Sequence, residues 1–151
     1  MAVAVRGLSF SCLAVVLMLA CGRDRIGPPR GAHLDGWPSD NAEFPPPPAR
    51  AEVVSTNPGG QCVWVDGYYH WEARRWEWRP GGWVVPPEGC YYAAPSLTWT
   101  EARGQGALLY TPPRWYPDDT AGLSDEEILA RCTNPLPCSP PARPYRPRGE
   151  R

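Results

Sequence analysis

The sequence predicts a mainly β fold, in which two tandem β-hairpin units form a small antiparallel sheet, with one short carboxy-terminal helix and extensive coil. Three observations lead to this prediction. The 151 residues include 21 Pro and 15 Gly, which interrupt helices and long central strands. Tryptophan and tyrosine recur at fixed spacing between residues 61 and 117. Apolar and polar residues alternate within this segment, as expected for a sheet with one buried face.

An internal repeat organises the aromatic segment. When Cys62 is aligned with Cys90, the shift of 28 residues also superimposes other aromatic positions, and a four-residue insertion restores the match further along the chain. The superimposed pairs are Trp64 with Tyr92, Trp71 with Trp99, Trp78 with Tyr110 and Trp83 with Trp115. Two tandem units are therefore expected, over residues 62–85 and 90–117.

Each unit is expected to form a β-hairpin. A turn over residues 72–75 places Trp71 opposite Trp76 and Tyr69 opposite Trp78 on one face, with His70 opposite Glu77 on the other. The positions that correspond to the first face in the second unit are all apolar, namely Leu97, Trp99, Leu108 and Tyr110. The glycines of the first unit are expected at bulges or sharp bends where strands leave the sheet, at Gly67, Gly81 and Gly82.

The repeat resembles a group of bacterial envelope proteins that carry YXWGXW or WXXGXW repeats. Residues 78–83 read Trp-x-x-Gly-x-Trp, and residues 64–69 follow the same pattern with Tyr in the last place. The second unit departs from it, with Pro95 and Pro113 where glycine is expected. The resemblance implies an exported, β-rich envelope module and assigns no catalytic residue.

The first twenty residues read as a secretory signal peptide. Arg6 precedes an apolar run that reaches Ala20 and is too short for a transmembrane helix. The run ends at Cys21 in a sequence that resembles a bacterial lipobox, which implies lipidation of Cys21 and a membrane anchor. Gly22 after the cysteine favours the outer membrane by the rule of that family. Ordinary cleavage that leaves Cys21 unmodified is the alternative.

Composition divides the rest of the chain into four parts. Residues 21–60, with four consecutive prolines, are expected to form a proline-rich tether. Residues 61–117 form the aromatic β domain, residues 118–139 a short helix and a cysteine loop, and residues 140–151 a disordered tail. Ser124 and Glu127 have the spacing of a capping box, which predicts the start of the helix.

Four cysteines remain in the mature chain beyond Cys21, and an even number in an exported protein indicates disulfides. Three pairings are possible. We expect Cys62 to pair with Cys90, because equivalent strand starts of a repeat can lie side by side, and Cys132 to pair with Cys138. Zinc binding is the alternative for these cysteines, but the spacing of the last two fits zinc ligands poorly.

Charge and residue types favour a non-enzymatic function. Fifteen arginines against 16 acidic residues give a formal net charge of -1, which disfavours nucleic-acid binding. His70 and the scattered carboxylates show no catalytic spacing, and no cofactor or metal is expected. The sequence thus predicts a structural or interaction role in the cell envelope, with an envelope polysaccharide or protein as the partner. The alternative is a module that binds peptidoglycan or exopolysaccharide by stacking on Tyr68, Trp83 and Trp115.

Overall fold

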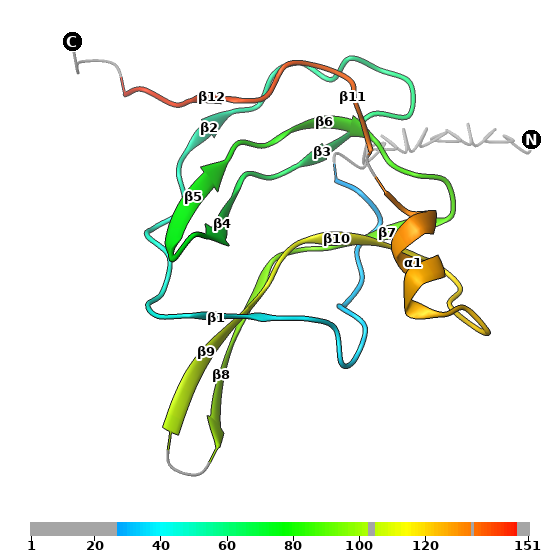
Figure 1. The fold of residues 1–151 in the computed structure, drawn as a ribbon. Coiled ribbons are helices and arrows are strands. Elements are labelled where there is room, and N and C mark those ends of the chain that lie inside the picture. Colours follow the sequence, from blue (N-terminus) through cyan, green and yellow to red (C-terminus); the bar gives the residue numbers. More distant parts are fainter. Residues whose placement is uncertain (1–26, 103–104, 134, 148–151) are drawn as a thin grey trace, which may run out of the picture.

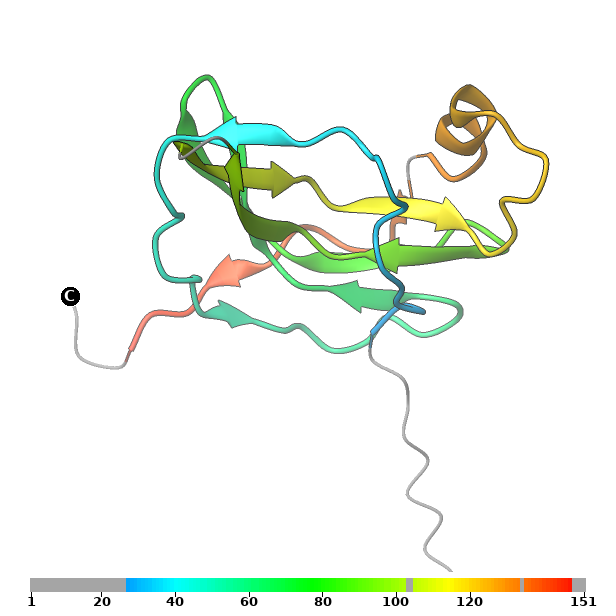
Figure 2. The same ribbon diagram turned by 90° about the horizontal axis from the view of Figure 1, so that it is seen from below.

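A computed structural model describes residues 27–102, 105–133 and 135–147. The expected signal peptide and Cys21 lie outside these residues. Figures 1 and 2 show a mainly β protein with several small antiparallel sheets and one short helix. Its elements are β1 (Asp40–Ala42), β2 (Glu52–Val53), β3 (Val63–Val65), β4 (Tyr68–Glu72), β5 (Arg75–Arg79), β6 (Gly82–Val85), β7 (Cys90–Ala93), β8 (Ser96–Ala102), β9 (Gln105–Thr111), β10 (Arg114–Pro117), α1 (Asp125–Arg131), β11 (Leu136–Pro137) and β12 (Arg143–Pro144).

Two long, bent hairpins dominate the structure, one formed by β3 to β6 and the other by β7 to β10. The first keeps one register throughout, because Trp64 of β3 faces Trp83 of β6 and Trp71 of β4 faces Trp76 of β5. The equivalent of the Trp64–Trp83 pair in the second hairpin is Tyr92 opposite Trp115. The expected hairpins and their registers are confirmed.

The connection between β4 and β5 is a two-residue loop. Ala73 and Arg74 both have positive φ, 49° and 60°, which is the conformation that favours tight hairpins but that residues other than glycine adopt at a cost. The strand pairing is interrupted between β3 and β4 and between β5 and β6, where the hairpin bends. The register is the same on both sides of the bend, so neither strand gains an extra residue there. A Cβ at Gly81 would lie 2.7 Å from the carbonyl oxygen of Val65, so this bend requires glycine.

The second hairpin is less buried than its sequence suggests. β8 and β9 extend away from the rest of the molecule (Figure 1), and β8 lies at the edge of the sheet β1-β9-β8. Tyr110 is buried as expected, but Trp99 is 67% exposed and Leu97 is also exposed. The expectation that Trp99 lies on a buried face is wrong, because in the described structure no other element covers the turn end of this hairpin.

Residues 27–55 contact the hairpins or β12, so the expected tether is wrong for this part of the chain. β1 pairs with β9, β2 pairs with β12, and Arg30 forms an isolated bridge with Tyr92. The tail is also ordered at least through β12, because the backbone N–H of Tyr145 donates to the carbonyl oxygen of Ala51 at 2.9 Å. Both segments complete small sheets through main-chain hydrogen bonds.

The four cysteines form two disulfides, as expected, but with a different pairing. Cys62 is bonded to Cys138 and Cys90 to Cys132. The expected Cys62–Cys90 pair fails because the two hairpins do not continue one sheet side by side. Instead β11 pairs with β6 at the open end of the first hairpin, while α1 contacts β10 at the open end of the second.

The helix α1 begins as the sequence predicts. Ser124 is the N-cap, its hydroxyl accepts from the backbone N–H of Glu127, and the Glu127 carboxylate accepts from the backbone N–H of Ser124. Ile128 is the buried residue of this helix and packs with Tyr116 and Ala93. Within the described residues, α1 is the helix present, and it is not long and apolar enough to cross a membrane.

Candidate functional site

The candidate site is an aromatic cavity of about 300 Å³ between the two hairpins. Strands β4 and β5 provide one side of it, and β8 and β9 provide another. The proline-rich segment before β2 lines it as well. The lining residues are Pro46, Pro47, Ala49, Gly67, Tyr68, Tyr69, Trp76, Trp78, Pro95, Ser96, Leu97 and Tyr110.

Edge-to-face contacts hold the rings of the cavity in place. The ring centroids of Tyr69 and Trp78 lie 4.9 Å apart with an interplanar angle of 71°. Trp76 and Tyr110 join the two hairpins with centroids 5.1 Å apart and planes at 90°. This geometry complements the negative face of one ring with the positive edge of another. The cavity is therefore bordered by rings whose orientation is set before anything binds.

The segment 44–50 is fixed on the aromatic strands by polar contacts. The indole N–H of Trp76 donates to the carbonyl oxygen of Phe44 at 2.9 Å. Arg50 lies over the rings of Tyr69 and Trp78, at 5.8 and 6.0 Å from their centroids, and its Nε donates to the Tyr69 hydroxyl at 3.3 Å. These cation–π and hydrogen-bond contacts explain why the proline-rich segment forms a wall of the cavity.

The carboxylate of Glu52 is hydrogen-bonded to the first hairpin near its bend. Glu52 accepts from the indole N–H of Trp78 at 2.9 Å and from the backbone N–H of Gly81 at 3.1 and 3.2 Å. A Cβ at Gly67 would lie 2.7 Å from the Glu52 carboxylate and 2.5 Å from the Trp78 ring, so the carboxylate occupies space that a side chain would fill. Glu52 is thereby a structural hydrogen-bond acceptor that positions Trp78.

The cavity is lined by tyrosine hydroxyls and by the hydroxyl of Ser96, and burial disfavours ionisation of Tyr68 and Tyr110. Burial raises the pKa of Tyr68, against a smaller lowering by the Arg79 guanidinium. Burial also raises the pKa of Tyr110, whose hydroxyl lies 3.2 Å from Nδ1 of His70. A neutral hydroxyl both donates and accepts hydrogen bonds. The cavity thus combines ring faces with neutral hydrogen-bonding groups.

The structure separates the three residues that the sequence predicts for ligand stacking. Tyr68 is half-buried and lines the cavity. Trp83 is only 2% exposed and donates its indole N–H to the carbonyl oxygen of Ser55, while Trp115 is 7% exposed and packs on Tyr92. Burial gives Trp83 and Trp115 a packing role, so the proposal that they stack on a ligand is withdrawn.

Sequence reasoning missed the role of Trp76, Trp78 and Tyr110 in the cavity, because it assigned the shared face entirely to the core. The signal was present in the register, which places Tyr69 opposite Trp78 and Leu97 opposite Tyr110 on equivalent faces. The contribution of Pro46 and Pro47 carried no such signal, since prolines show no periodic pattern.

The two histidines have structural partners. His33 lies 3.1 Å from the Tyr116 hydroxyl and 2.7 Å from the carbonyl oxygen of Ala94. His70 faces Glu77 across the hairpin as expected, but its hydrogen bond goes to Tyr110. Across the described residues, no group of three or more His, Cys, Asp and Glu side chains is placed to hold a metal ion.

Neither a protein-family model nor a curated protein nor a solved structure matches this chain. Its function therefore has to be inferred from the chemistry of its own residues.

Proposed function

We propose that this chain is a non-enzymatic, lipid-anchored protein of the bacterial cell envelope, placed in the outer membrane, with a structural or interaction role. The lipobox-like sequence that ends at Cys21 supports the anchor, and the resemblance to WXXGXW repeats supports the envelope. Two disulfides are compatible with an exported protein, since such bonds persist in oxidising compartments.

The observation that carries the interaction role is the lining of the aromatic cavity. Its walls are ring faces, prolines and small residues, which bind by stacking and by hydrogen bonds. Both described histidines are within hydrogen-bond distance of tyrosine hydroxyls, His33 of Tyr116 and His70 of Tyr110, and Glu52 is occupied by Trp78 and Gly81. We infer that the cavity recognises a partner and leaves it chemically unchanged.

Mass spectrometry of the protein from a membrane fraction tests the anchor. We expect the mature chain to begin at Cys21 with acyl chains attached, and a Cys21→Ser variant to leave the membrane fraction. An unmodified amino terminus on membrane-associated protein would refute the anchor.

A second candidate function is carbohydrate binding, and the Tyr68 ring in the cavity favours it specifically. Retention on insoluble peptidoglycan tests this proposal, with Tyr68→Ala expected to lose retention through the loss of ring stacking. Trp99→Ala is a matched control, because Trp99 is an exposed aromatic that does not line the cavity. Absence of retention for the wild-type protein would exclude peptidoglycan as the ligand. Variants of Trp83 or Trp115 are unsuitable, since truncating a buried indole costs about 3–5 kcal/mol of stability.

A further inference from the structure

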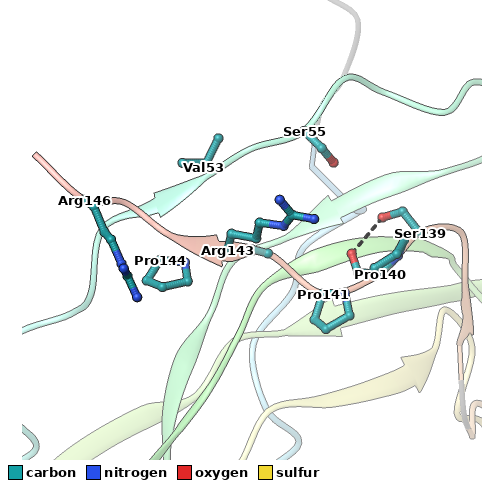
Figure 3. A pocket seen from close by; sticks show the side chains of 9 residues that line it. Val53, Ser55, Ser139, Pro140, Pro141, Arg143, Pro144 and Arg146 are labelled. Carbon is teal, nitrogen blue, oxygen red and sulfur yellow. Dashed lines mark hydrogen bonds between the residues drawn. The ribbon is translucent and has the colours of Figure 1, made fainter. Parts of the chain in front are cut away.

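A second hollow lies on the face formed by β2 and β12. This groove has a volume of about 670 Å³ and runs between Val53 and Ser55 on one side and the segment 139–146 on the other (Figure 3). Three prolines give it apolar walls, and the hydroxyls of Ser55 and Ser139 lie at its rim. In Figure 3 the guanidinium of Arg143 points toward the space between these two serines.

The arginines of this groove differ from the other arginines that the structure describes. Four of the others are ion-paired, namely Arg30, Arg74, Arg75 and Arg79. Arg50 and Arg114 lie over aromatic rings. Arg131 lies in the last turn of α1. Neither Arg143 nor Arg146 has a carboxylate within 4.0 Å in the described part of the chain. Two exposed cations beside a groove favour an anionic ligand.

Apolar side chains are exposed beside the groove. Val53 pairs with Arg143 in the register of β2 and β12, and Tyr145 directly follows β12. Val53 is 50% exposed and Tyr145 is 57% exposed. Arginine together with exposed tyrosine and aliphatic side chains is the composition of surfaces that lie at the interface of a bilayer.

The start of the described chain is ion-paired to the bend of the first hairpin that lies beside β2. Arg30 is ion-paired with Asp66 at 3.2 Å, and Asp66 shares the lining of a shallow hollow with Glu52 of β2 and with Val54. Figures 1 and 2 agree that the blue segment starts beside β3, while β8 and β9 extend away from this start.

The chain between the lipidation site and this segment is short. Gly27 follows Cys21 by six residues, which span at most about 20 Å even when fully extended. A lipid on Cys21 would therefore keep the β2–β12 half of the molecule close to the bilayer. The contacts of residues 27–55 with the hairpins and β12 remove the long spacer that the sequence suggested.

We propose that the groove between β2 and β12 binds the phosphate of anionic lipid headgroups at the membrane surface. The Arg143 guanidinium, which points into the groove, forms charge-assisted hydrogen bonds with the phosphate, Arg146 adds a second positive charge beside the groove, and Tyr145 lies at the level of the headgroups. This inference builds on the proposed lipid anchor, because the anchor defines which half of the molecule faces the bilayer.

Vesicle flotation of the mature chain, residues 21–151 with Cys21→Ser, tests the groove by itself, because it carries neither an acyl group nor the apolar leader. We expect binding to vesicles of equal parts phosphatidylglycerol and phosphatidylcholine, and weaker binding to phosphatidylcholine alone. Exchanging both groove arginines, Arg143→Gln with Arg146→Gln, should lower the partition coefficient about thirty-fold at low salt, at roughly 1 kcal/mol for each arginine.

The matched control exchanges two arginines outside the groove, Arg74→Gln with Arg75→Gln at the β4–β5 turn, and loses the same charge. We expect this control to bind as the wild type does. Equal losses in both double variants, or no loss in the groove variant, would overturn the proposal. Displacement by millimolar glycerol phosphate would also overturn it, since the ligand would then be a soluble phosphate. The anchor has its own readout in the mass of the amino terminus, so the two proposals fail separately.

Discussion

The two disulfides allow a quantitative test, because loop length and burial predict opposite orders for their contributions. Cys62 and Cys138 are separated by 76 residues and Cys90 and Cys132 by 42. On the chain-entropy model these loops correspond to about 4.5 and about 3.9 kcal/mol of stabilisation. Cys90 and Cys132 are also buried in a core cluster with Tyr92 and Trp115, whereas Cys62 and Cys138 are partly exposed.

We therefore expect replacement of Cys90 and Cys132 by alanine to destabilise the protein more than replacement of Cys62 and Cys138. The cavity left by the two buried sulfur atoms adds about 1–2 kcal/mol to the first pair of substitutions. Urea denaturation followed by tryptophan fluorescence compares the two variants directly. A lower stability of the Cys62→Ala, Cys138→Ala variant would show that loop length outweighs burial and would refute the reasoning.

Three further predictions concern single sites. Arg74→Gly should raise the free energy of unfolding by about 1 kcal/mol, because glycine adopts the φ of 60° without cost and the exposed ion pair with Glu43 contributes little; thermal denaturation measures this. Ser124→Ala should lower it by about 1 kcal/mol through loss of the capping box, and an unchanged urea midpoint would contradict that role. Burial raises the pKa of Tyr116 to about 12, so the folded state favours the neutral phenol; its contribution is complete below pH 10 and is lost as the pH rises toward 12, which alkaline titration of stability would detect.

Local patterns of side chains were sufficient to predict the hairpins and the helix start. Alternation over residues 68–79 determines which side chains face each other, so Tyr69 opposite Trp78 follows from the position of the turn. Ser124 and Glu127 satisfy each other within one helical turn. Tyr68 was recognised as a candidate binding residue because the register places it opposite Arg79, on the other face from Tyr69 and Trp71.

Pairing that depends on the main chain alone left no trace in the sequence. β1 and β2 are three and two residues long, and their hydrogen bonds to β9 and β12 require no periodic side chains. Periodicity therefore could not distinguish residues 27–60 from a tether. The wall that Pro46 and Pro47 add to the cavity depends on this packing. The disulfide pairing likewise depends on where α1 and β11 return to the hairpins.

The nested order of the disulfides has a consequence for how the protein matures. When a chain emerges from a membrane pore with its amino end leading, Cys62 and Cys90 become available to an oxidase well before Cys132 and Cys138. Oxidation in order of appearance would join Cys62 to Cys90, a bond that the folded protein does not contain. If the chain is exported as proposed, maturation requires either a disulfide isomerase or completion of the second hairpin and α1 before the first thiol is oxidised.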